Sequence, residues 1–217
     1  MTLQDWLATP VIVALPDRHR GDGLARLKAD ALLREPGLVK IFFFEYESTA
    51  HTHDRVLQQD YGRSLNGAIS EMLDRGASRA TALRALPDYM PRLALLDARP
   101  NLNELVATAV GNGVQALAAD RDYAEVRDLL AAAGLSEINM GYEPGMRLRD
   151  PSVSRMVAGY LAAANGAGAG RLMLWGEGHF TEAAADPAAN LCDARLQVLL
   201  AQRGLPVHVA TPQEMAL

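Results

Sequence analysis

Five short apolar runs divide this chain, and segments with helical spacing separate them. Each run predicts a buried strand, because it is apolar and far shorter than an ordinary helix. The segments between the runs predict helices that cover the strands. This alternation predicts an α/β fold, in which a mainly parallel β-sheet is flanked by helices. The predicted strands span residues 11–15, 38–44, 114–119, 171–175 and 207–210.

The segments between the strands give further expectations. Residues 23–35 predict a helix, and a strand–helix–strand unit of this length favours parallel pairing of the first two strands through a right-handed crossover. Pro16 is expected to close the first strand. Residues 136–150 have no clear period and contain Pro144 and Gly145, which predicts a long functional loop. The other predicted helices are 55–75 and 77–86, which form a helical insertion after the second strand, then 102–110, 123–133, 152–164 and 191–203.

Composition narrows the class of protein. A chain of 217 residues with 49% hydrophobic and 22% charged residues is typical of a globular protein, and we expect one domain over residues 1–217. The net charge is −5 and no long basic run is present, so a nucleic-acid partner is not expected. A single cysteine, Cys192, can form no internal disulfide.

The first residues contain neither a basic segment nor an apolar stretch typical of a secretory signal. No apolar run approaches the roughly 20 residues that span a bilayer, so no membrane span is expected. We therefore expect a cytoplasmic protein, and secretion as an effector without a recognisable signal stays open. The sequence indicates no particular oligomeric state.

Two strand ends resemble each other. Asp17 and His19 follow the first strand, and Glu177 and His179 follow the fourth, so each apolar run leads into an acid two residues before a histidine. In open parallel sheets, ligands bind outside the carboxyl ends of the strands. The sequence therefore predicts a polar site built around His19 and His179.

Further polar residues are expected at the same edge. Glu45 follows the second strand, and Asp120 ends the third. Histidine can act as a general base or as a metal ligand, and a buried glutamate can orient an imidazole or activate water itself. Arg149 could hold a carboxylate substrate or stabilise an oxyanion. We predict His19, Glu45, His179 and Arg149 as catalytic residues, and Asp17, Asp120, Glu177, Arg147 and Tyr142 as substrate-binding residues.

Two other features allow more than one interpretation. His51 and His53 could supply two metal ligands if the chain is extended, but Asp54 also fits as the cap of the following helix, which favours a polar loop. Cys192 lies at a predicted helix start with no adjacent base, which favours a structural cysteine. The cofactor prediction is accordingly open between none and a divalent transition metal.

The strand-end motifs occur in a familiar order. They read P-D-R-H, F-F-E, A-A-D, R-D-P-S-V and G-E-G-H, at residues 16–19, 43–45, 118–120, 149–153 and 176–179. This order resembles the superfamily of erythromycin esterases, TraB/TIKI proteins and ChaN-like haem-binding lipoproteins, whose domains also occur in large bacterial toxins. The resemblance covers about residues 11–212. Three positions depart from the pattern: Pro16 replaces glycine, Asp17 replaces glutamate and Val153 replaces methionine.

The resemblance implies a hydrolase-like enzyme that cleaves an ester or amide (peptide) bond in a small-molecule or peptide substrate. In this interpretation His19 or His179 activates water, Glu45 assists and Arg149 stabilises charge. The branches of the superfamily differ in mechanism, since one resembles metal-free esterases, one metal-dependent peptidases and one haem-binding proteins. The alternatives are a peptide- or protein-modifying tailoring enzyme or effector on the same site, and a non-catalytic module that binds a ligand or haem.

Overall fold

The structure is a computed structural model, and it describes residues 1–17, 23–47, 100, 102–121, 123–136, 143–164, 168–180 and 195–216. Within these residues the chain forms a five-stranded sheet with the order β3-β2-β4-β1-β5, and every pair of neighbouring strands is parallel. The predicted α/β fold class is confirmed. The helices predicted at 55–75 and 77–86 lie outside the described residues. The strands are β1 (Ile12–Asp17), β2 (Ile41–Glu47), β3 (Gln115–Asp120), β4 (Arg171–Gly176) and β5 (Val207–Val209).

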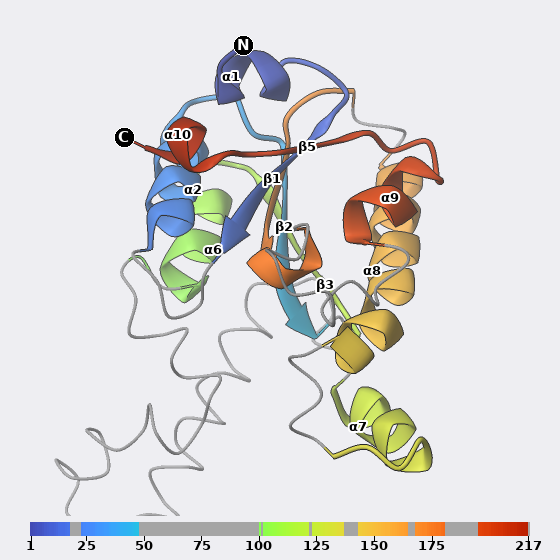
Figure 1. The fold of residues 1–217 in the computed structure, drawn as a ribbon. Coiled ribbons are helices and arrows are strands. Elements are labelled where there is room, and N and C mark those ends of the chain that lie inside the picture. The colour runs from blue at the N-terminus through green and yellow to red at the C-terminus, as the bar shows by residue number, and fades with distance from the viewer. Residues whose placement is uncertain are drawn as a thin grey trace, which may run out of the picture.

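Helices cover both faces of the sheet (Figure 1). The first face carries α1 (Leu3–Leu7), α2 (Leu24–Arg34), α6 (Leu102–Gly111) and α10 (Pro212–Met215). The second face carries α8 (Glu143–Ala163) and α9 (Leu196–Ala201), and α7 (Tyr123–Ala132) packs on α8. A short 3-10 helix, η4 (Glu177–His179), follows β4 directly. No helix of the described residues is both long and apolar enough to cross a membrane.

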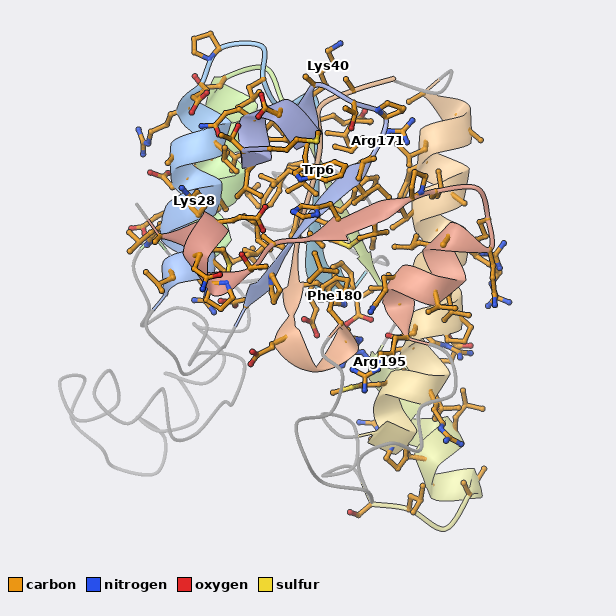
Figure 2. All side chains as sticks on the ribbon, turned by 45° about the horizontal axis from the view of Figure 1, so that its top comes forward. Trp6, Lys28, Lys40, Arg171, Phe180 and Arg195 are labelled. Atoms are coloured by element: carbon orange, nitrogen blue, oxygen red, sulfur yellow. The ribbon has the colours of Figure 1, made fainter. Side chains whose placement is uncertain are left out.

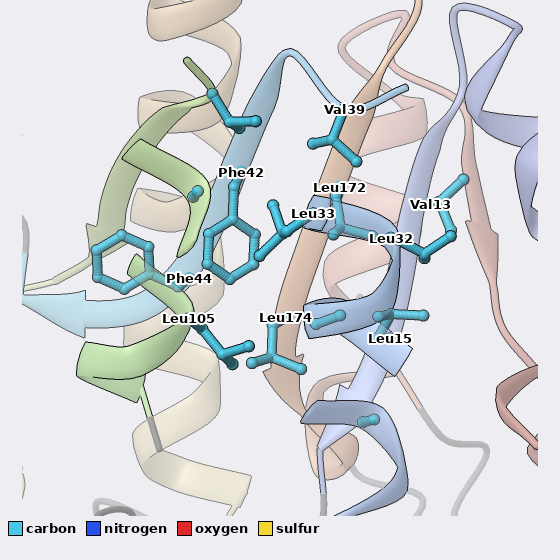
Figure 3. Close-up of a cluster of buried hydrophobic side chains, with 14 of the residues drawn as sticks. Val13, Leu15, Leu32, Leu33, Val39, Phe42, Phe44, Leu105, Leu172 and Leu174 are labelled. Atoms are coloured by element: carbon cyan, nitrogen blue, oxygen red, sulfur yellow. The ribbon is translucent and has the colours of Figure 1, made fainter. Parts of the chain in front are cut away.

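The core forms because the strands are apolar on both sides. Successive side chains of a strand point to opposite faces, so Phe42 and Phe44 pack under α2 and α6 while Ile41 and Phe43 pack under α8. Figure 3 shows the first of these layers, where Leu33 and Leu105 meet Phe42 and Phe44. Continuous apolar runs such as β2 are what a parallel sheet covered on both faces requires.

One topological prediction was wrong. β1 and β2 are parallel, but they do not pair, because β4 lies between them. Leu174 of β4 stands in register with Leu15 of β1 on one side and with Phe44 of β2 on the other. The connection through α2 therefore skips one strand position, and β4, which comes much later in the chain, fills the gap.

Pro16 does not close the first strand, as the sequence led us to expect, since β1 continues to Asp17. The backbone N–H of Ile12 donates to Pro206 and the carbonyl of Ala14 accepts from Ala210, so the even-numbered residues of β1 direct their backbone groups toward β5. β5 pairs only with Ile12–Ala14. The missing N–H of Pro16 therefore faces a position beyond the end of β5, where no ladder bond is lost.

Residues 143–150 are helical, although the sequence predicted a loop there. Pro144 falls in the first turn of α8, where a helix needs no N–H donor. In the later part of α8, Val153 and Val157 face the sheet and repeat at helical spacing, which is the pattern that predicts a helix. Its earlier part buries Arg149 and Asp150, so no apolar period marks that part as a helix.

The last long helix also differs from its prediction. α9 begins at Leu196 rather than at residue 191, because Arg195 is extended, with φ −74° and ψ 159°. The two ends of the sheet can be followed in Figure 2, where Arg171 lies at the start of β4 and Phe180 lies just beyond its end. The candidate site is built at the end that Phe180 marks.

Candidate functional site

Three strands end side by side at the carboxyl edge of the sheet. Asp17, the last residue of β1, stands in register with Gly176, the last residue of β4. The backbone N–H of Gly176 donates to Oε2 of Glu45 from β2, at 2.7 Å. The neighbouring strands thus bring polar residues near their carboxyl ends to the same edge of the sheet, as the rule for parallel sheets predicts.

His179 lies at the centre of this region. The turn η4 places it directly after β4, with 3% of its surface exposed. Its Nδ1 lies 2.5 Å from Oδ1 of Asp150, which is 1% exposed and comes from α8. The indole of Trp175 meets the imidazole edge-on, with ring centroids 6.3 Å apart. A carboxylate on Nδ1 fixes the ring orientation and leaves Nε2 as the nitrogen that can exchange a proton with a further group.

Glu45 lies on the other side of the imidazole. Its Oε1 is 3.6 Å from Nε2 of His179, which is longer than a hydrogen bond between well-placed partners. The Glu45 side chain is 12% exposed, whereas the side chain of His179 is 2% exposed. Solvent therefore reaches Glu45 more readily than the imidazole behind it.

Arg149 joins Glu45 to a buried aspartate. Its Nε donates to Oδ1 of Asp120 at 3.1 Å, and its Nη2 donates to Oδ2 of Asp120 and to Oε1 of Glu45. Asp120 is fully buried, and its Oδ1 also accepts the backbone N–H of Arg121 at 2.7 Å. A planar guanidinium suits this arrangement, because it can bind two carboxylates in fixed directions.

These contacts form a row of alternating charge, in the order Asp150, His179, Glu45, Arg149, Asp120. Burial alone would lower the pKa of His179, but Asp150, and after it Glu45, stabilise the imidazolium more strongly and raise this pKa to about 9. The imidazole is therefore protonated at neutral pH. The arrangement can hold a proton on Nε2 beside a carboxylate and deliver it to a group that reaches that position.

Asp17 has a different partner. It is 4% exposed and binds Arg26 of α2, which is 2% exposed. Nε of Arg26 donates to both carboxylate oxygens at 3.2 and 3.0 Å, and Nη2 donates to Oδ2 at 2.8 Å. This buried pair lies on the first face of the sheet, where α2 packs, whereas Asp150 comes from α8 on the second face.

The structure thus separates the predicted site residues into two groups. Glu45, Asp120, Arg149 and His179 lie together in the row of alternating charge. Asp17 and Glu177 instead line a pocket with the start of α2 and with α10. Arg147 is exposed on α8, and residues two apart on a helix do not share a face, so it points away from Arg149. The predicted residues outside the described part of the chain are His19, Tyr142, His51, His53, Asp54 and Cys192.

Two residues of these networks were not among the predicted site residues. In the sequence Asp150 stands out only as part of the R-D motif, and its place next to Arg149 is the signal that could have indicated it. Arg26 lies among Ala25, Ala29 and Leu33 on the buried side of α2. A lone arginine on the apolar side of a helix that follows a strand-end aspartate could have indicated a buried ion pair.

In the part of the chain that the structure describes, no group of three or more His, Cys, Asp or Glu residues could hold a metal ion. Comparison with protein-family models, curated proteins and solved structures finds no match to this chain. The resemblance to the erythromycin esterase, TraB/TIKI and ChaN-like superfamily therefore stays a prediction.

Proposed function

We propose that this protein is a hydrolase that cleaves an ester or amide bond, and that His179 supplies the proton for the leaving group. The proposal rests on the buried pair of Asp150 and His179. Nε2 of His179 lies on the side of the partly exposed Glu45. An imidazole oriented by a carboxylate on one nitrogen is the usual arrangement of a general acid–base catalyst.

The protonation state of His179 supports a role as proton donor. With a pKa of about 9, His179 is an imidazolium at neutral pH, so it donates a proton before it can accept one. The distance of 3.6 Å to Glu45 leaves the Nε2 proton within reach of another acceptor. In the reaction, water adds to the carbonyl carbon, the bond to the leaving oxygen or nitrogen breaks, and that atom takes the proton from His179.

A second group must remove the proton from the attacking water. We propose His19 for this role, because β1 leads to it and β1 pairs with β4 as far as Asp17 and Gly176. The proton that His19 takes from water then returns through solvent to His179, which restores both imidazoles. In this proposal His19 keeps the water-activating role that the sequence predicted for His19 or His179. Glu45 lies between Arg149 and His179 and assists His179.

The role of Arg149 in this proposal is to position Glu45. Its guanidinium already binds the carboxylates of Asp120 and Glu45, and its side chain is only 5% exposed. Glu45 in turn stabilises the imidazolium of His179, so Arg149 acts on the reaction only through the placement of this carboxylate. Small-molecule and peptide substrates both fit this chemistry.

The test is hydrolysis of p-nitrophenyl esters of short acids and of fluorogenic peptide amides by the wild-type protein and by two matched variants. His179→Gln removes the proposed acid, and His208→Gln removes another histidine–carboxylate pair, His208 with Glu214 at 2.9 Å. We expect His179→Gln to lower kcat/KM about 10²- to 10⁴-fold, as is typical of general acid–base groups, while His208→Gln stays near wild type. Folded His179→Gln protein with wild-type turnover would overturn the proposal, as would a wild-type protein that hydrolyses neither class.

A further inference from the structure

Gly178, the middle residue of η4, lies directly against a side chain of α8. A Cβ built on Gly178 would lie 2.6 Å from Cε and 3.5 Å from Sδ of Met146. Apart from the chain neighbours of Gly178, no other residue that the structure describes comes within 4 Å of that position. Carbon atoms that are not bonded pack no closer than about 3.5 Å, so the contact exists because residue 178 has no side chain.

The backbone gives no other reason for a glycine at this position. Gly170 and Gly204 have positive φ angles, which favour glycine, but Gly178 does not. Any residue could adopt the backbone conformation of residue 178. What requires glycine there is the close approach of Met146.

Met146 lies one helical turn before the residues of α8 that build the site. Residues three and four apart share a helix face, so Met146 lies on the same side of α8 as Arg149 and Asp150. The helix therefore touches η4 at two points one turn apart. The thioether lies against Gly178, and Asp150 binds Nδ1 of His179. The hydrogen bond alone would let η4 pivot about it, whereas the second contact fixes the tilt of the turn.

The two contacts differ in their exposure to solvent. Gly178 is exposed and Met146 is half-buried, whereas Asp150 and His179 are almost completely buried. The thioether thus makes the outer contact and the hydrogen bond the inner one. A flexible apolar side chain suits the outer contact, because it fills an irregular gap without adding a charge beside the row of alternating charge.

The position of the imidazole decides its proton affinity. Burial lowers the pKa of His179, but Asp150 and then Glu45, which face the imidazole from α8 and β2, raise it to about 9. The interaction between charges weakens with distance and with the entry of water. If η4 moved away from α8, the pKa of His179 would return toward its ordinary value of 6.5.

We propose that Met146 and Gly178 are positioning residues for the proton donor His179. The thioether of Met146, packed on Gly178, holds η4 against α8. The imidazole is thereby kept between Asp150 on one side and Glu45 on the other. A part for this contact in catalysis rests on the proposed hydrolase function, whereas the placement of the imidazole does not.

The test measures the pKa of His179 by NMR in folded variants. Met146→Ala removes the outer contact, so the acid dissociation constant of His179 should rise at least roughly tenfold. Met146→Leu keeps an apolar side chain of similar volume and should stay near wild type. Met156→Ala is the matched control, because Met156 is also half-buried and lies roughly 15 Å further along the same helix. If Met146→Ala does not fold, Met146→Val, which shortens the side chain less, replaces it throughout.

Gly178→Ala tests the same contact from the other side. In the wild-type background its Cβ collides with Cε of Met146, so the contact is displaced and the pKa of His179 should fall. In the Met146→Ala background the new methyl group fills part of the space that the thioether has left. The pKa should then rise above that of Met146→Ala alone. A general loss of stability would not produce this reversal of sign.

Three results would overturn the positioning role. They are a wild-type pKa of His179 in folded Met146→Ala, an equal shift in Met156→Ala, and a shift in the same direction by Gly178→Ala in both backgrounds. In turnover, Met146→Ala should lower kcat with little change in KM, because the thioether holds the proton donor and not the substrate. A raised KM with unchanged kcat would make Met146 a substrate contact instead and would overturn the proposal. Since the pKa shifts need no turnover, their presence in a protein that hydrolyses nothing would contradict the proposed function alone.

Discussion

Oδ1 of Asp150 lies 2.5 Å from Nδ1 of His179, and both residues are almost completely buried. The two come from different layers of the fold, since α8 covers the sheet and η4 continues one of its strands. Their contact couples the packing of α8 to the proton affinity of the imidazole. Measurements on this one histidine therefore test the arrangement of the whole row of alternating charge.

The first prediction concerns the pKa of His179 itself. NMR titration of the imidazole signals should give a pKa of about 9 in the wild-type protein. Asp150→Asn removes the stronger of the two carboxylates that hold the imidazolium, so this pKa should fall, and Glu45→Gln should lower it by a smaller amount. A His179 pKa that stays the same in Asp150→Asn would show that the pair does not control the proton.

The same shift predicts how stability depends on pH. The pKa of His179 is raised from 6.5 to about 9 in the folded protein. The stabilisation of the folded state by the protonated imidazole is therefore fully present below pH 6.5 and is lost as the pH rises through 9. We expect the free energy of unfolding, measured with urea, to fall by on the order of 3 kcal/mol over this window. The fall should persist in His208→Gln and disappear in His179→Gln. If the free energy of unfolding fell equally with pH in these two variants, His179 would not be the cause of the fall.

Arg149 should matter far more for stability than an exposed arginine with a similar partner. Arg149→Met leaves the carboxylates of Glu45 and Asp120 without their shared cation, which should cost about 3–5 kcal/mol. Arg34→Met is the control, because Arg34 binds Asp30 at 2.7 Å with 64% of its side chain exposed, and exposed surface pairs contribute little to stability. Urea unfolding of both variants measures the difference. A loss in Arg149→Met no larger than in Arg34→Met would contradict the buried network.

A pair of glycines tests the geometry at the opposite edge of the sheet. Gly170 precedes β4 with φ +81°, and a Cβ there would lie 2.9 Å from the carbonyl oxygen of Leu38 and from the N of Lys40. Gly170→Ala should therefore destabilise the protein by at least about 1 kcal/mol. Gly159 lies within α8 with nothing near its Cβ position, so Gly159→Ala should stabilise by about 0.5–1 kcal/mol. Thermal unfolding should move in opposite directions, and a shift in the same direction would contradict this geometry.

The sequence predicts the strands well because each is an apolar run covered on both faces. Phe42 and Phe43, which pack on opposite faces, show why no alternation was needed to identify β2. The order of the strands could not be predicted in this way. The position of β4 between β1 and β2 depends on contacts between segments that are distant in the sequence, and the local sequence pattern of these strands does not indicate it.

The candidate site was predictable where its residues end strands. Glu45, Asp120 and His179 meet because parallel strands end at one edge. Asp150 could not be found in this way, since it comes from a helix that buries charge rather than apolar residues and so lacks an apolar period. The separation of Asp17 from His179 was equally hidden, because its partner Arg26 comes from α2 on the other face.

The pH dependence of kcat/KM for the best substrate of the ester and peptide panel tests directly whether His179 is the proton donor. If His179 donates its proton to the leaving group, activity should fall as the pH rises through about 9, where the imidazolium is lost. The same fall should move to lower pH in Asp150→Asn, in step with the His179 pKa measured by NMR. An activity that rises through pH 9, or a fall at the same pH in wild type and Asp150→Asn, would show that His179 does not donate the proton.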